Sequence, residues 1–290
     1  MAAGKTTTDS LQDSLPFMIM SARQVREQEG DMMSLVDRQT LGKGMGLTWN
    51  EVDYAKLTAQ SITKTTELDN PQQLSDTNLP ITPAQIAIQV FILDEVGERI
   101  VQRGAAKLGG LAQNAMRRKK NIDGITAMDG FTTSLGGSGT LTYGHINAAS
   151  TRITGNTTEP GPLPIHCVLH DFQIKDLFDE IVSSVGTYEV TSGMTVDVFK
   201  NGFTGKVINR ATVHSNGDIP IVSNVSKGGV FARMALVLVQ GRSPRSVAVR
   251  AEHIGGGGTN FYHYDEYTYG ERSSGNWGYE IQSDSTVPTS

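Results

Sequence analysis

Residues 79–100 read LPITPAQIAIQVFILDEVGERI, and this stretch decides the fold because two different patterns meet in it. The run IAIQVFIL (86–93) is dense in apolar and β-branched residues, which favours a strand. From Asp94 onward the apolar spacing becomes 3.6 residues, which predicts a long helix from Asp94 to about Lys120. The residues that carry this spacing are Val96, Ile100, Leu108, Leu111 and Ala115. At a rise of about 1.5 Å per residue the helix would span about 40 Å, which is long for a compact domain.

The residues before this strand predict an extended β-hairpin over 46–92. Threonine-rich stretches with sparse apolar residues flank the polar tip ELDNPQQ (67–73). Such a ribbon cannot order itself, because an isolated two-stranded hairpin is only marginally stable in water. A disordered linker is the alternative interpretation, although the dense run that closes the segment argues against it.

The N-terminal segment, residues 1 to about 45, is polar and rich in methionine. Methionine suits adaptable contacts with irregular surfaces, so we expect an arm rather than part of a core. A helix is possible over Ala22 to Gln39, interrupted at Gly30.

Four consecutive cations, RRKK at 117–120, stand where the long helix is expected to end. Cations at a helix C-terminus complement the helix dipole, which is the simpler interpretation. Contact with packed nucleic acid is the alternative.

The second half of the chain alternates helices and strands. GHINAASTRI (144–153) predicts a helix, and VINRATVHSNGDIPIVSNV (207–225) a hairpin that turns at Asn216–Gly217. VFARMALVLV (230–239) predicts one apolar strand. Further strands are expected in SVAVRAEHI (246–254), FYHYDEYTYG (261–270) and NWGYEI (276–281), with a glycine loop at 255–258. The aromatics of 261–270 could stack on nucleic acid, but acidic neighbours favour a half-buried strand.

PLPIHCVLHDFQIKDLFDEI (162–181) contains the only cysteine, and its neighbours could serve a metal or a nucleophile. Pro164 and the apolar residues predict a strand, in which side chains alternate between faces. Cys167 then lies on the face opposite His166 and His170, and these two histidines lie about 13 Å apart, too far to share one metal ion. The simpler interpretation is a buried strand that enters a helix capped by Asp171, with Ile174, Leu177, Phe178 and Ile181 on its apolar face.

Composition excludes several classes of protein. The net charge of −5 argues against a strongly basic nucleic-acid binder, and a single cysteine excludes an internal disulfide. No apolar run approaches the roughly 18 residues of a membrane span, and the first 20 residues do not resemble a signal peptide. AAGKTT (2–7) lacks the upstream glycine of a phosphate-binding loop. We therefore expect no cofactor, no bound metal and no catalytic residue.

The order of these parts resembles the major capsid proteins of tailed bacteriophages, which have the Hong Kong 97-like fold. The resemblance runs from about residue 40 to 285 and rests on LPITPAQIAIQVFILDEVGERI, INAASTRI, the strand before Asp171, GDIPIVSNV and YGERSSGNWGYEIQSDSTV. It implies an α+β fold with an N-terminal arm (1–45), an extended hairpin loop (46–92), a peripheral domain with a long spine helix (93–140 and 241–290) and an axial α/β domain (141–240).

The resemblance also implies what the protein does. We expect a structural subunit, not an enzyme, that self-assembles through hexamers and pentamers into an icosahedral shell enclosing double-stranded DNA. Expected partners are other copies of the chain, a separate scaffolding protein, a portal and a possible decoration protein, and the expected location is the virion after synthesis in the host cytoplasm. The charged residues expected to contact neighbouring subunits are Lys64, Glu67, Arg99 beside Glu98, and Arg103. The alternatives are an encapsulin-like compartment and a cytosolic enzyme that uses Cys167.

Overall fold

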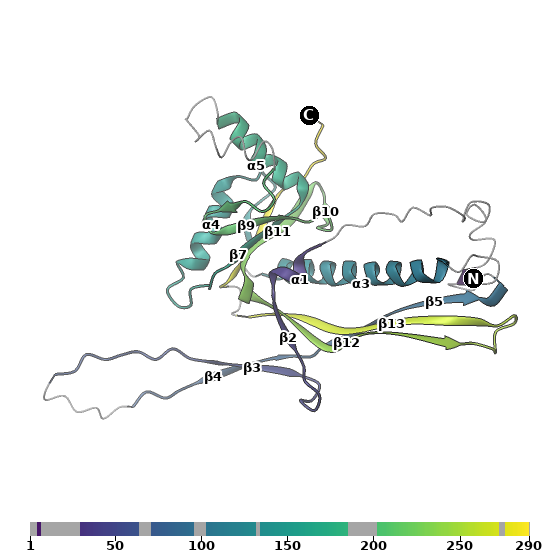
Figure 1. The fold of residues 1–290 in the computed structure, drawn as a ribbon. Helices are drawn as coiled ribbons and strands as arrows, with labels where there is room; N and C mark the ends of the chain where they lie inside the picture. The colour runs from purple at the N-terminus through teal and green to yellow at the C-terminus, as the bar shows by residue number, and fades with distance from the viewer. Residues whose placement is uncertain are drawn as a thin grey trace.

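A computed structural model describes residues 5–6, 30–63, 71–95, 103–131, 134–184, 202–272 and 276–289, with the main chain only at 5–6, 103–108 and 182–184. Figure 1 shows two sheets, a long helix beside one of them, and a ribbon that projects from the body. The α+β class expected from the sequence is confirmed.

A five-stranded sheet has the order β1-β5-β13-β12-β2. Its strands are β1 (Lys5–Thr6), β5 (Ala84–Leu93), β13 (Gly258–Glu271), β12 (Leu236–Arg250) and β2 (Asp37–Thr40). The three long strands pair antiparallel, whereas both N-terminal strands are added parallel at the edges. Of the strands expected near the C-terminus, 261–270 lies within β13, 246–254 is a strand only as far as Arg250, and 276–281 belongs to the other sheet. Segments of the N-terminal arm border the five-stranded sheet on both sides.

The helix α3 (Arg103–Asp129) lies along one face of this sheet (Figure 1). The long helix is thus confirmed, but its expected end near Lys120 is wrong. The helix continues because Ile125 and Met128 are buried against both sheets. The run at 117–120 consequently lies in the middle of α3 and does not cap its end.

A second, seven-stranded sheet carries helices on both faces. Its strands are β6 (Ser134–Gly136), β14 (Gly278–Asp284), β11 (Val225–Ala232), β7 (Ile165–Leu169), β9 (Ala211–Ser215) and β8 (Val207–Ile208), in that order, with β10 (Ile221–Val222) beside β11. One face packs on α4 (Tyr143–Thr154) and α5 (Asp171–Ser184) through a core that includes Ile146, Cys167 and Leu177.

The opposite face forms a second core that joins the sheet to α3 and to α1 (Met32–Leu35). Val168 and Phe231 contribute from the sheet, Met128 from α3 and Met32 from α1, all with at most 1% of their surface exposed. Burial of such side chains typically stabilises a fold by about 1.5–3 kcal/mol each. This second core fixes the seven-stranded sheet against α3.

The expected strand over 230–239 is two strands in two different sheets. β11 ends at Ala232, the 3-10 turn η2 (Arg233–Ala235) follows, and β12 begins at Leu236 in the other sheet. The sequence does not reveal the break, because the end of β11 and the start of β12 are both buried on both faces and form one continuous apolar run.

The expected hairpin turn at Asn216–Gly217 is also wrong. The hairpin turns lie at Asn209–Arg210, between β8 and β9, and at Ser223–Asn224, between β10 and β11. All four of those residues have positive φ, as type I′ turns require. Asn216 instead exchanges side-chain hydrogen bonds with Asn121 of α3, at 2.9 and 3.1 Å.

The possible helix over Ala22 to Gln39 extends beyond the described residues at its N-terminal side. Within them the helix is short: α1 ends at Leu35 and the chain pairs as β2 with Val237–Gln240. Residues 37–39 of the expected helix therefore form part of strand β2 and pair with β12.

The extended hairpin is confirmed in the pair β3 (Trp49–Tyr54) and β4 (Asp76–Ile81), which form a two-stranded antiparallel ribbon. Its return strand ends earlier than expected, because β5 leaves the ribbon at Ala84 and joins the five-stranded sheet. Among the described helices, none combines the length and hydropathy that a membrane span needs.

Candidate assembly surface

The β3–β4 ribbon projects away from the rest of the chain (Figure 1). Beyond the paired strands its two limbs are held by Ala55 N–H donating to Ser75 O and by Thr58 N–H donating to Gln72 Oε1, both at 2.9 Å. Large apolar side chains along it are 46–65% exposed, namely Val52, Tyr54, Leu57, Ile62 and Leu74. Apolar side chains grouped on one projecting element mark a surface that another molecule covers.

The root of the ribbon is packed against the five-stranded sheet. Ile81 is buried on Val237 and Val239, with Trp49 and Leu79 beside them. Gly270 lies beneath Ile81, where an added Cβ would come within 2.2 Å of the Ile81 side chain. The ribbon is therefore packed onto the sheet at its base, whereas the large apolar side chains farther out are exposed.

Arg272, at the end of β13, joins three elements at this root. Its Nε lies 2.6 Å from Glu51 Oε2 of β3, and its Nη2 lies 2.8 Å from Asp37 Oδ2 of β2. The guanidinium carbon is 5.9 Å from the centroid of the Trp49 ring. Burial would raise the pKa of Asp37, but hydrogen bonds from Gln39 and Arg272 and the Arg272 charge outweigh it and lower that pKa. Arg272 thus holds the arm and the ribbon to one strand.

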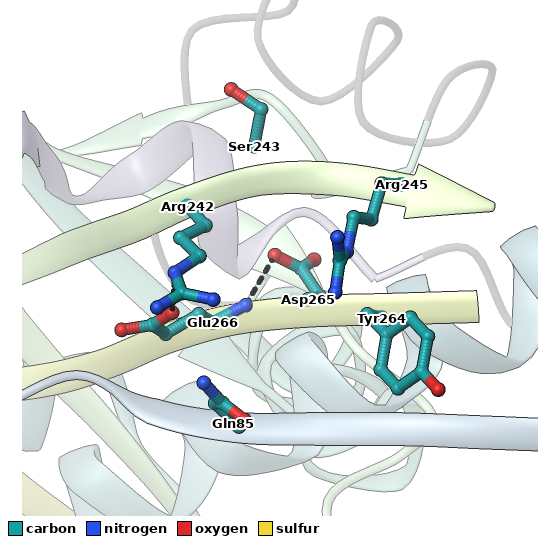
Figure 2. A pocket seen from close by; sticks show the side chains of 7 residues that line it. All are labelled: Gln85, Arg242, Ser243, Arg245, Tyr264, Asp265 and Glu266. Carbon is teal, nitrogen blue, oxygen red and sulfur yellow. Dashed lines mark hydrogen bonds and ion pairs between the residues drawn. The ribbon is translucent and has the colours of Figure 1, made fainter. Parts of the chain in front are cut away.

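A shallow pocket of about 150 Å³ opens where β12 and β13 pair irregularly (Figure 2). Arg242 Nε lies 3.1 Å from Glu266 Oε2, and the Arg245 guanidinium carbon lies 5.1 Å from the centroid of the Tyr264 ring. The Glu266 side chain packs closely over Gly241, where an added Cβ would lie 2.7 Å from a carboxylate oxygen. The remaining lining residues are Gln85, Ser243 and Asp265. Arg242 and Arg245 are both exposed, and guanidinium groups of this kind suit a carboxylate of a partner.

Beneath this pocket a buried ion pair joins α3 to β13. Lys120 Nζ lies 2.6 Å from Asp265 Oδ2 and 4.8 Å from the Tyr267 ring centroid. Gln240 bonds to both partners of the pair. Lys120, one of the four cations at 117–120, is therefore buried in an ion pair and cannot contact nucleic acid.

The cluster around the only cysteine does not form a reactive site. Cys167 is fully buried in the first core, and this burial raises the pKa of its thiol. As predicted, His166 and His170 lie apart from it: His166 pairs with His214, and His170 caps α5. The structure describes no group of three or more potential metal ligands in the placed part of the chain.

The predicted helix cap at Asp171 is displaced by one residue. His170 is the cap, because its Nδ1 accepts the Phe172 N–H at 3.1 Å while its own N–H donates to Gln173 Oε1 at 3.0 Å. Asp171 is the first helical residue and accepts a hydrogen bond from Ser215 Oγ. The predicted apolar face of α5 is confirmed by Leu177 and Ile181, both buried.

The predicted subunit-contact residues cannot be placed at a contact. Lys64, Glu67 and Arg99 lie outside the described residues, as does the side chain of Arg103, so these four stay predictions. Sequence reasoning missed Trp49, Arg242, Arg245 and Arg272. The available signal was arginine within an otherwise strand-like pattern, RSPR at 242–245, but it does not indicate a partner.

A projecting ribbon, a long helix along an antiparallel sheet and a second sheet covered by two helices together define the Hong Kong 97-like capsid fold. The chain is similar to the capsid structure of cyanophage P-SCSP1u, with a TM-score of 0.72, 11% identity and 92% of each chain covered. It is also similar to a structure of Mycobacterium phage Che8, with a TM-score of 0.70, 13% identity and 91% and 95% covered. A third similar structure is the capsid of Ralstonia phage GP4, with a TM-score of 0.67, 11% identity and 93% and 96% covered.

No protein-family model and no curated protein matches the sequence. At these low identities the likeness establishes the fold, and the function follows only as a proposal.

Proposed function

We propose that this chain is the major capsid protein of a tailed bacteriophage, a structural subunit rather than an enzyme. The observation that carries the proposal is the β3–β4 ribbon, packed at its root and carrying five exposed large apolar side chains, on a fold shared with phage capsids. Such a ribbon gains contacts only when another copy covers it, as in an obligate oligomer.

The proposed assembly consists of hexamers and pentamers that close into an icosahedral shell around double-stranded DNA. In this arrangement residues 1–45 act as an arm, 46–92 as the extended hairpin loop, 93–140 with 241–290 as the peripheral domain, and 141–240 as the axial domain. Arms and hairpins interlock neighbouring subunits. The net charge of −5 suits a container that must release its genome, because each phosphate contact would add to DNA affinity.

The proposed partners are other copies of the chain, a separate scaffolding protein, a portal and a possible decoration protein. The proposed location is the virion, after synthesis in the cytoplasm of the bacterial host. An encapsulin-like compartment is the second candidate, because the same fold would serve a shell that holds protein cargo.

The experiment replaces exposed apolar residues on the ribbon by serine in one triple variant, L57S/I62S/L74S. These side chains are 57–60% exposed, so we expect the subunit to keep its unfolding midpoint and to lose shell assembly in negative-stain images. The matched control, V207S/V222S/V287S, changes valines of 59–69% exposure elsewhere and should assemble.

Shells from the ribbon variant as abundant as those from the unchanged chain would contradict the proposed role of the ribbon. Nuclease-protected DNA inside native particles supports a virus, whereas protein cargo without DNA would favour the compartment.

A further inference from the structure

Two histidines meet on the face of the seven-stranded sheet that packs against α1 and α3. His166 Nδ1 on β7 lies 3.2 Å from His214 Nε2 on β9, with ring centroids 5.2 Å apart. The strands pair in parallel with Val168 opposite His214, so both rings project from the same face as the buried Val168. Neither histidine is fully buried, and the pair borders the second core through Phe231, whose ring centroid lies 6.2 Å from that of His166.

The hydrogen bond between the two imidazole rings depends on how many protons the rings carry. One ring nitrogen must donate and the other accept, so the bond exists when at least one imidazole is neutral. When both are protonated, both facing nitrogens carry hydrogen and the two cations repel at short distance. The contact therefore tolerates one proton but not two.

The two histidines have charged neighbours of opposite sign. Asp31, immediately before α1, attracts a proton to His214, and Arg233 of η2 opposes a charge on His166. Phe231 of β11 adds an apolar ring and no charge. As the pH falls, His214 is therefore protonated first, and His166 is protonated only at lower pH.

We propose that the His166–His214 contact is a proton-sensitive latch that holds β9 and the segment around Asp31 in place, and that double protonation opens it. After opening, His214 turns toward the Asp31 carboxylate and His166 toward solvent. Because β9 is followed by Asn216 and Asp218, which bond to Asn121 of α3, opening also loosens the junction between the sheet and the helix.

The sign of the pH dependence follows from the titration. Burial first, then the charges of His214 and Arg233, lower the pKa of His166 to about 4 from its ordinary 6.5. Burial likewise lowers the pKa of His214, against the attraction of Asp31. The unfolded chain thus binds more protons than the folded one, so the contact is intact above about pH 6.5 and is lost progressively toward pH 4.

The test uses the full chain and does not depend on shell assembly, so it can fail while the proposed function stands. Hydrogen exchange, corrected for intrinsic rates, is followed in residues 30–36 and 211–216 from about pH 7.5 to about pH 4.5. The variants are H166N with H214Q, which keep polar atoms near Nδ1 and Nε2 but do not titrate. The control is H253Q, at an exposed histidine in the loop between β12 and β13.

We expect protection of both segments to fall about tenfold on acidification in the unchanged chain and in H253Q, and to change by less than about threefold in the double variant. If the double variant is unstable at neutral pH, the single variant H214Q should respond to acid less than the unchanged chain, because His166 still titrates there but meets no second cation. Protection that does not respond to pH in the unchanged chain, or an equal response in H166N/H214Q or H214Q, would overturn the proposal.

Discussion

Arg272 Nε and Glu51 Oε2 lie 2.6 Å apart, and this contact ties the root of the projecting ribbon to the end of β13. The side chain of Arg272 is only 8% exposed, and Glu51 and Asp37 are the counter-ions that stabilise its buried positive charge. Arg272 therefore helps to hold the ribbon at its root, together with the packing of Ile81 on Val237 and Val239.

Replacement of Arg272 by alanine should destabilise the subunit by about 2–4 kcal/mol, because two carboxylates would lose their partner near the core. Urea unfolding measures this directly. The matched control is R250A: Arg250 also contacts two carboxylates, Asp94 and Glu252, but its side chain is 57% exposed and we expect no measurable change. Equal effects of the two variants would show that the root contact has no special importance.

Replacement of Lys120 by methionine should cost about 3–5 kcal/mol, because Asp265 would be left buried without a counter-ion. The double variant K120M/D265L should recover much of this loss, since no isolated charge remains. The neighbouring Lys119, whose side chain is 54% exposed, serves as the control, and K119M should unfold like the unchanged chain. If K120M also unfolds like the unchanged chain, the buried ion pair does not stabilise the contact between α3 and the sheet.

Cys167 should resist thiol reagents in the native subunit. Its burial excludes the reagent and raises the pKa of the thiol, so little thiolate is present at neutral pH. Labelling should proceed at the rate of unfolding and become fast in denaturant. Rapid labelling of the folded chain, together with an activity lost in C167S, would instead support the enzyme hypothesis.

Reversal of the charge at Arg245 should reduce shell assembly while leaving subunit stability unchanged, because its guanidinium lies on an exposed face over Tyr264. Particle yield measured by sedimentation separates R245E from the control R117E, an exposed arginine on α3. Equal particle yields would indicate that the pocket in Figure 2 has no role at a contact.

Local patterns predicted much of this fold because strands and helices with one buried face carry their period in the sequence. The strand at 165–169, the apolar face of α5 and the pairing of β3 with β4 are confirmed on that basis. The end of α3 and the turn near Asn216 were not predicted, since Ile125, Met128 and Asn121 find their partners in distant segments. Arg272 was missed for the same reason: nothing in its neighbours along the chain indicates Asp37 or Glu51.

The central claim is that this chain forms a closed shell, and particle mass tests it most directly. Sedimentation or mass measurement of the purified full chain, co-expressed with its scaffolding protein where one is needed, should show megadalton particles rather than the 31.2 kDa subunit. Negative-stain images of the same material should show closed shells of uniform size. A stable monomer or dimer under all assembly conditions would contradict the account.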